Sequence, residues 1–213
     1  MNISHWLSKT FSSPSKGDED LLRPLTRVPR EALSDPNYSM EGDAVLMLTV
    51  LHDSTDERQT IENETKRREY VAAYCRTVAD ASTRHEGDIV AFLGPYILSM
   101  FGLPEKPESV QPTHAAFTSA ATIRSGWEIV LQKARGSNSS VPEVSIVITG
   151  GNVWLGPLGS ESRRTFAPVG YCVSRAFEMA SRSRVGTTVI ARNLTGVDLE
   201  KFRNQLGQIA IDP

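Results

Sequence analysis

The segment 144–180, VSIVITGGNVWLGPLGSESRRTFAPVGYCVSRAFEMA, contains the pattern that decides the fold. Its β-branched run 145–149 stops at Gly150–Gly151, as expected for a buried strand followed by residues with a permissive backbone. The run Val153–Leu155, which stops at Gly156–Pro157, predicts a second short strand. We expect these two strands to face each other across a turn.

The remainder of this segment predicts a turn and then a helix. Residues 159–164, GSESRR, are polar and predict a turn. After Pro168 and Gly170, apolar residues recur at the three- and four-residue spacing of a helix. These apolar positions are Val173, Ala176, Phe177 and Ala180.

A second segment, 87–104, has the sequence GDIVAFLGPYILSMFGLP and predicts a hairpin. Residues 89–92 and 97–101 are expected to form strands on either side of a turn at Gly94–Pro95. The near-continuous apolar run 43–53 predicts a central strand that is covered on both faces.

The other elements follow from the same periodicities. Amphipathic patterns predict helices over 66–83 and 113–133, a strand over 187–191 and a short helix over 198–206. Alternating strands and helices of this kind favour an α+β domain whose helices pack on one face of a sheet.

Taken together, the two segments resemble the catalytic domains of class III adenylyl and guanylyl cyclases. The resemblance lies in the order strand, Thr-Gly-Gly, strand, Gly-x-x-Gly-Ser-x-x-Arg-Arg, Val-Gly, helix, and in the hairpin with its Leu-Gly turn. It covers roughly residues 44–195. It implies a ferredoxin-like cyclase palm, in which helices pack on a central, mostly antiparallel sheet, for a domain spanning 41–213.

Composition limits the other possibilities. Of the 213 residues, 39% are hydrophobic and 23% are charged, which is typical of one soluble domain with a tail. The Ser- and Pro-rich segment 1–40 predicts an extended leader, either a linker or an arm that docks on a partner. A net charge of −2 favours neither nucleic acid nor anionic membrane. No apolar run is long enough for a bilayer span, so we expect a soluble, intracellular protein.

The resemblance implies chemistry that depends on two divalent metals, Mg or Mn, held by two carboxylates. Asp53, at the end of the first predicted strand, is the candidate for one ligand, and a shifted register would place Thr49 there instead. A loop-start or helix-cap role is the alternative for Asp53. The second position, in the hairpin turn, is Pro95, whose side chain offers no ligand.

The other reactive positions that the resemblance implies have also changed. The purine-reading lysine corresponds to Ala91, and its partner on the following strand corresponds to Ala167. The ribose-orienting asparagine corresponds to Ser174. The arginine that stabilises phosphate charge corresponds to Glu178, which reverses the sign of the charge where the transition state needs a cation.

Three functions compete on these observations. The first is a catalytically inactive cyclase-like domain that acts as a dimerising, regulatory or scaffold module in cyclic-nucleotide signalling or a larger assembly. The second is an active adenylate or guanylate cyclase with displaced metal ligands. The third is a subunit that complements an active partner. We predict the first, with no bound cofactor, as a homodimer or as a heterodimer with a cyclase-like or other protein.

Overall fold

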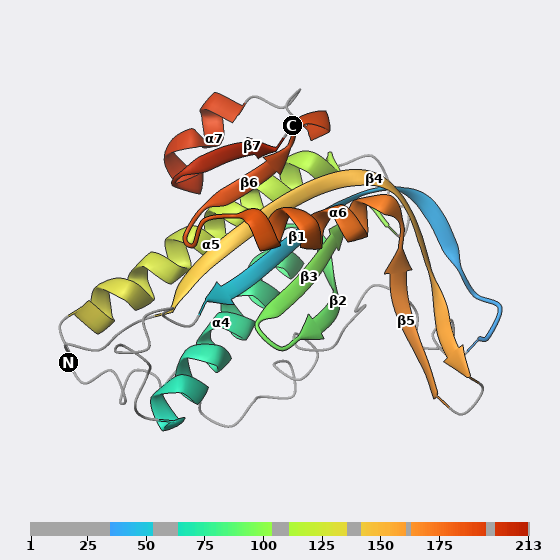
Figure 1. The fold of residues 1–213 in the computed structure, drawn as a ribbon, viewed down its shortest axis with the longest axis horizontal. Coiled ribbons are helices and arrows are strands. Elements are labelled where there is room, and N and C mark those ends of the chain that lie inside the picture. Colours follow the sequence, from blue (N-terminus) through green and yellow to red (C-terminus); the bar gives the residue numbers. More distant parts are fainter. Residues whose placement is uncertain are drawn as a thin grey trace.

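A computed structural model of the chain describes residues 35–52, 64–103, 111–135, 142–160, 163–194 and 199–212. Within these ranges the chain forms one mixed sheet with helices on both of its faces (Figure 1). The α+β class and the predominantly antiparallel pairing predicted from the sequence are confirmed. Most of the predicted leader, 1–40, lies outside the described residues, as does Asp53.

The sheet has seven described strands in the order β2-β3-β1-β4-β6-β7, and β5 pairs with the far part of β4. Strand β1 is antiparallel to both of its neighbours, whereas β6 is parallel to β4 and β7 is parallel to β6. The strands are β1 (Met40–His52), β2 (Gly87–Leu93), β3 (Tyr96–Phe101), β4 (Glu143–Ser160), β5 (Arg163–Val169), β6 (Thr188–Ala191) and β7 (Ile209–Asp212).

The helices lie close to their predicted positions. They are α4 (Glu64–Arg84), α5 (Pro112–Arg135), α6 (Tyr171–Arg182) and α7 (Leu199–Leu206), with a short 3-10 helix, η1 (Arg192–Leu194). Tyr74 of α4 meets Trp127 of α5 edge to face with ring centroids 6.2 Å apart. The rings of Phe117 of α5 and Phe202 of α7 have their centroids 5.5 Å apart. Within the described residues, no helix combines the length and apolarity needed to cross a bilayer.

Strand β1 is buried on both faces, and this determines where the helices lie. Val45, Met47 and Leu51 belong to one core cluster with residues of α4 and α5. The alternate residues 44, 46, 48 and 50 belong to a second cluster with residues of α6. The prediction that helices pack on one face only is therefore wrong. A strand that is apolar on both faces needs cover on both, and α6 supplies the second layer (Figure 1).

The prediction of two short strands at 145–149 and 153–155 is also wrong, because β4 is one strand of 18 residues. Gly150 and Gly151 do not end it; they pair with Val45 and Ala44 of β1. A Cβ on Gly150 would lie only 2.7 Å from the Leu194 side chain, which would have to shift to admit one. Pro157 is tolerated because pairing with β1 ends at Leu155, which leaves β5 as its one neighbouring strand.

The long β4 strand carries an arm that projects from the sheet, at the right of Figure 1. We call residues 40–43 of β1, 152–160 of β4 and all of β5 the arm; they are joined by antiparallel pairing. Tyr38 packs on Phe166 of β5 with ring centroids 6.2 Å apart. Residues 38–40, which the sequence placed in the leader, therefore contact the folded domain. Strand β5 was not predicted from the sequence, and only its first two residues, 163 and 164, belong to the predicted polar turn 159–164.

Candidate functional site

The turn between β2 and β3 is fixed by its backbone and by hydrogen bonds to its carbonyl group. Gly94 adopts a φ of 66°, a left-handed conformation that glycine reaches without strain. The carbonyl oxygen of Pro95 accepts a hydrogen bond from the Leu51 amide at 2.9 Å. The hydroxyl of Tyr74 lies 3.2 Å from the same oxygen. The main-chain oxygen of Pro95 is thus already engaged, and its ring offers no donor or ligand.

Thr49 is held on the α4 side of the sheet. Its hydroxyl donates to the Ile97 carbonyl at 3.3 Å and lies 2.8 Å from the Tyr74 hydroxyl. Both side chains are buried, and burial raises the pKa of Tyr74, which therefore stays protonated and able to donate. Thr49 faces away from α6, the helix that carries Ser174 and Glu178. The structure therefore does not bring the Thr49 side chain together with those positions.

Helix α6 presents Ser174 and Glu178 to solvent, one helical turn apart. The Glu178 carboxylate lies 2.7 Å from the Arg182 guanidinium, in an i,i+4 ion pair that is largely exposed. Arg175, the neighbour of Ser174, does not replace the missing cation. Its guanidinium donates to Asp212 of β7 at 2.7 Å and to the Tyr171 hydroxyl at 3.3 Å, so it is directed along the helix and toward β7.

The two alanine positions lie in apolar surroundings. Ala91 of β2 packs against the α6-side core cluster together with Tyr96, Phe166 and Phe177. Ala167 of β5 pairs with Gly156 of β4. Between the hairpin and α6, Tyr96 and Phe177 bring their rings to a centroid separation of 6.0 Å. Apolar and aromatic side chains thus surround Ala91 and Ala167. The sequence analysis did not predict these surroundings.

In the described part of the chain, the hairpin turn offers no side-chain ligand for the two-metal centre that the resemblance implies. Magnesium and manganese prefer oxygen ligands, with carboxylates foremost. No group of three or more His, Cys, Asp or Glu side chains gathers anywhere in the described ranges. The hairpin turn supplies Pro95, and α6 supplies one carboxylate that is ion-paired with Arg182. Asp53, the candidate for the other ligand, lies outside the described residues.

Solved structures of nucleotide cyclases share this fold. The chain aligns with the guanylyl cyclase Cya2 at a TM-score of 0.64 and 23% identity, covering 74% of this chain and 79% of that one. It aligns with the adenylyl cyclase CyaB from P. aeruginosa at a TM-score of 0.67 and 18% identity, covering 76% and 83%. At these identities the likeness establishes a nucleotide-cyclase catalytic-domain fold.

A third likeness is to the guanylyl cyclase domain of the RhoGC fusion protein from the aquatic fungus Blastocladiella emersonii. That domain has been solved in a non-canonical dimeric form, with a TM-score of 0.58, 15% identity and coverage of 76% and 86%. It has also been solved as a monomer, with a TM-score of 0.56 and 15% identity. Neither a family model nor a curated protein matches the sequence of this chain.

We predict that Tyr74→Phe loosens the hairpin turn. The substitution removes the hydroxyl that joins Thr49 to the Pro95 carbonyl and leaves buried oxygens without that donor, so the free energy of unfolding should fall by about 1–2 kcal/mol. Urea denaturation measures it. Tyr70→Phe, one turn earlier on the same helix and also buried, is the matched control. A loss no larger than that of the control would contradict the role given to this hydroxyl.

Proposed function

We propose that this chain is a catalytically inactive nucleotide-cyclase-like domain that acts as a pairing module with a regulatory or scaffold role. The observation that carries the proposal is the hairpin turn. Where the fold family needs a metal carboxylate, the chain has a proline whose carbonyl oxygen is engaged by Leu51 and Tyr74. A metal ion at this point would lack one of the two protein carboxylates that hold it in the two-metal mechanism.

The charge on α6 supports the same proposal. Phosphoryl chemistry needs positive charge at the phosphates in the transition state. Glu178 presents a carboxylate at the implied phosphate position, and Arg182 pairs with it from the next turn of the helix. The nearest other cation on this helix, Arg175, is bound to Asp212. The described part of α6 therefore opposes a triphosphate at the position where the reaction requires attraction.

The arm supports the pairing part of the proposal. Leu158 and Val169 on the arm are 40% and 47% exposed, and Tyr171 at the start of α6 is 74% exposed. Exposed apolar side chains on a projecting element favour a protein interface there. The RhoGC domain, which shares this fold, provides a dimeric precedent. We therefore place the partner contact on the arm and the adjoining start of α6.

We expect the purified chain to form no cyclic nucleotide from ATP or GTP. The physical reason is the combined absence of a hairpin carboxylate at Pro95 and of a cation at Glu178. Product is measured by chromatography in the presence of magnesium and of manganese, with a buffer blank. Cyclic product above the blank that Asp53→Ala abolishes would establish instead an active cyclase with displaced ligands.

The charge reversal on α6 can be tested by restoring it. For a change of two charge units at roughly 7 Å, with an effective dielectric of about 20, Coulomb's law gives about 5 kcal/mol. Screening at this exposed site reduces the expected gain in ATP affinity for Glu178→Arg to about tenfold. Pro95→Asp, added to Glu178→Arg, should make binding depend on magnesium or manganese. Calorimetry measures both.

The matched control for this charge change is Glu128→Arg, an equal change at an exposed position on α5. Because α5 covers the opposite face of the sheet, the control should leave ATP affinity unchanged. If Glu178→Arg had no more effect than Glu128→Arg, and Pro95→Asp added no metal response, the assignment of both positions would be wrong. The likeness to cyclases would then support the fold alone.

We expect the chain to pair through the arm, with itself or with a cyclase-like protein. Leu158→Lys combined with Val169→Lys places two charges on the apolar surface and should weaken a homodimer at least about tenfold, since buried unpaired charges are costly. Analytical ultracentrifugation measures the dissociation constant. Ile129→Lys, at a residue 50% exposed on α5, is the control for an apolar-to-lysine change elsewhere. A strictly monomeric protein at high micromolar concentration, with no partner in native pull-downs, would contradict pairing.

A further inference from the structure

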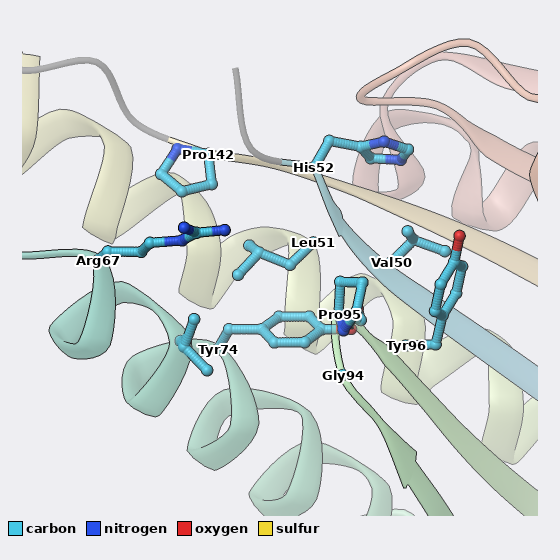
Figure 2. Close-up of a pocket in the computed structure, with 10 residues that line it drawn as sticks. Val50, Leu51, His52, Arg67, Tyr74, Gly94, Pro95, Tyr96 and Pro142 are labelled. Carbon is cyan, nitrogen blue, oxygen red and sulfur yellow. Dashed lines mark hydrogen bonds between the residues drawn. The ribbon is translucent and has the colours of Figure 1, made fainter. Parts of the chain in front are cut away.

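A pocket of about 530 Å³ opens at the end of the sheet, between α4, the last residues of β1 and the hairpin turn (Figure 2). It takes its lining from both faces of the sheet. Leu51 and Tyr74 belong to the α4-side core cluster, whereas Val50 and Tyr96 pack in the α6-side cluster. In Figure 2, Leu51 and Tyr74 lie on one side of the Pro95 ring, and Val50 and Tyr96 lie on the other.

The polar side chains of this wall offer little to a ligand. The Tyr74 hydroxyl already contacts the Thr49 hydroxyl and the Pro95 carbonyl oxygen. Arg67, at the entrance from α4, already has an interaction partner. Figure 2 shows the His52 ring directed away from Arg67. The surface that the pocket presents to an incoming group is therefore mostly apolar.

Two apolar side chains at the pocket are left open to solvent. Val71 lines it and is 40% exposed, and Leu93, next to Gly94 of the turn, is 49% exposed. Covering such side chains with apolar groups is favourable. A strongly hydrated anion such as a triphosphate would lose its water against this wall and gain few polar contacts. The pocket is therefore complementary to apolar side chains.

The leader of this chain carries side chains of that kind. Trp6 and Phe11 are the two aromatic residues of segment 1–34, and Leu7 follows Trp6 directly. Residues 1–17 contain no Asp or Glu, so no carboxylate in this segment would have to be buried. Tryptophan is the residue most typical of an anchor that fills an apolar pocket on a protein surface.

The leader is long enough to reach the pocket. The described chain joins the domain at the arm, where Tyr38 packs on Phe166. From there β1 runs 13 residues to His52 at the pocket, a distance of about 40 Å. The chain from Trp6 to Asp35 can span at most about 100 Å. Docking within one chain also avoids the loss of freedom that association of a separate molecule involves.

We propose that the leader docks on its own domain, with Trp6 and Leu7 in this pocket against Val71, Leu51 and Pro95. The contact joins the leader to α4 and to the hairpin turn, two elements that the Tyr74 hydroxyl already links. It depends on the apolar wall alone, so it holds whether or not the chain makes a cyclic nucleotide.

The first test compares amide spectra of the full, isotope-labelled chain. Trp6→Ser removes the anchor and should shift the amide signals of Leu51, Val71, Gly94 and Tyr96, although Trp6 is far from all of them in the sequence. Leu25→Ser, an equivalent change later in the same leader, is the matched control and should leave these four signals unchanged.

The second test changes the wall and observes the leader. Val71→Lys places a charge on the apolar wall and should shift the indole N–H signal of Trp6, which is assigned by its loss in Trp6→Ser. Ile129→Lys, at a residue 50% exposed on α5, is the control and should leave that signal in place. Circular dichroism checks that each variant folds.

The third test uses a synthetic peptide of residues 1–17. It should bind the full-length Trp6→Ser variant at least about tenfold more tightly than the unmodified chain, whose own leader competes for the pocket. The same peptide with Trp6→Ser should bind that variant at least about tenfold more weakly, the effect of losing an aromatic anchor. Calorimetry measures these affinities.

Several results would overturn the proposal. They are equal spectra at the four amides for Trp6→Ser and Leu25→Ser, an unmoved Trp6 signal in folded Val71→Lys, and equal peptide affinity for the chains with and without Trp6. Pocket signals that return to those of Trp6→Ser on dilution would show that the leader of a second copy occupies the pocket instead. The comparison of Trp6→Ser with Leu25→Ser decides the question even if Val71→Lys fails to fold.

Discussion

The rest of the structure depends on the burial of β1 on both edges and both faces. Its edges are paired with β3 and β4, and every residue from Ala44 to Leu51 is buried. Fully burying a residue such as Leu or Val stabilises the fold by about 1.5–3 kcal/mol, so this strand alone makes a large contribution. The requirement for cover on both sides places α4 and α5 behind the sheet and α6 in front.

Apolar periodicity predicted the elements whose pattern is local. The helices over 66–83 and 113–133 and the hairpin at Gly94–Pro95 were identifiable because each buries one stripe or alternates within a few residues. The length of β4 was not, because Gly150 and Gly151 stay in the strand through their pairing with Val45 and Ala44 of β1, a distant segment of the chain. The pairing that allows Pro157 in β4 depends likewise on where β1 begins, at Met40.

The sequence predicted which elements carry the residues of the candidate site, but it did not predict the hydrogen bonds and contacts around them. Pro95, Ser174 and Glu178 have the locations that the hairpin and the helix implied. Nothing in the sequence showed that the Pro95 carbonyl would be engaged by Leu51 and Tyr74, because Tyr74 is 21 residues away in the chain. The orientation of Thr49 needed the strand register, since a shift of one residue moves a side chain to the opposite face. These features arise from contacts between distant segments.

Pro95 separates two different environments. On the α6 side lie Ala91, Tyr96 and Phe177, packed with the second core cluster, and the exposed pair of Glu178 and Arg182. On the α4 side lie Leu51 and Tyr74, which engage the Pro95 carbonyl oxygen. Under the proposed function, Pro95 stands where a metal site needs a carboxylate, and its ring supplies neither a charge nor a ligand. On this proposal the turn lacks a metal ligand while α6 places the carboxylate of Glu178 where phosphates need a cation, so the two positions act together against a metal-bound triphosphate.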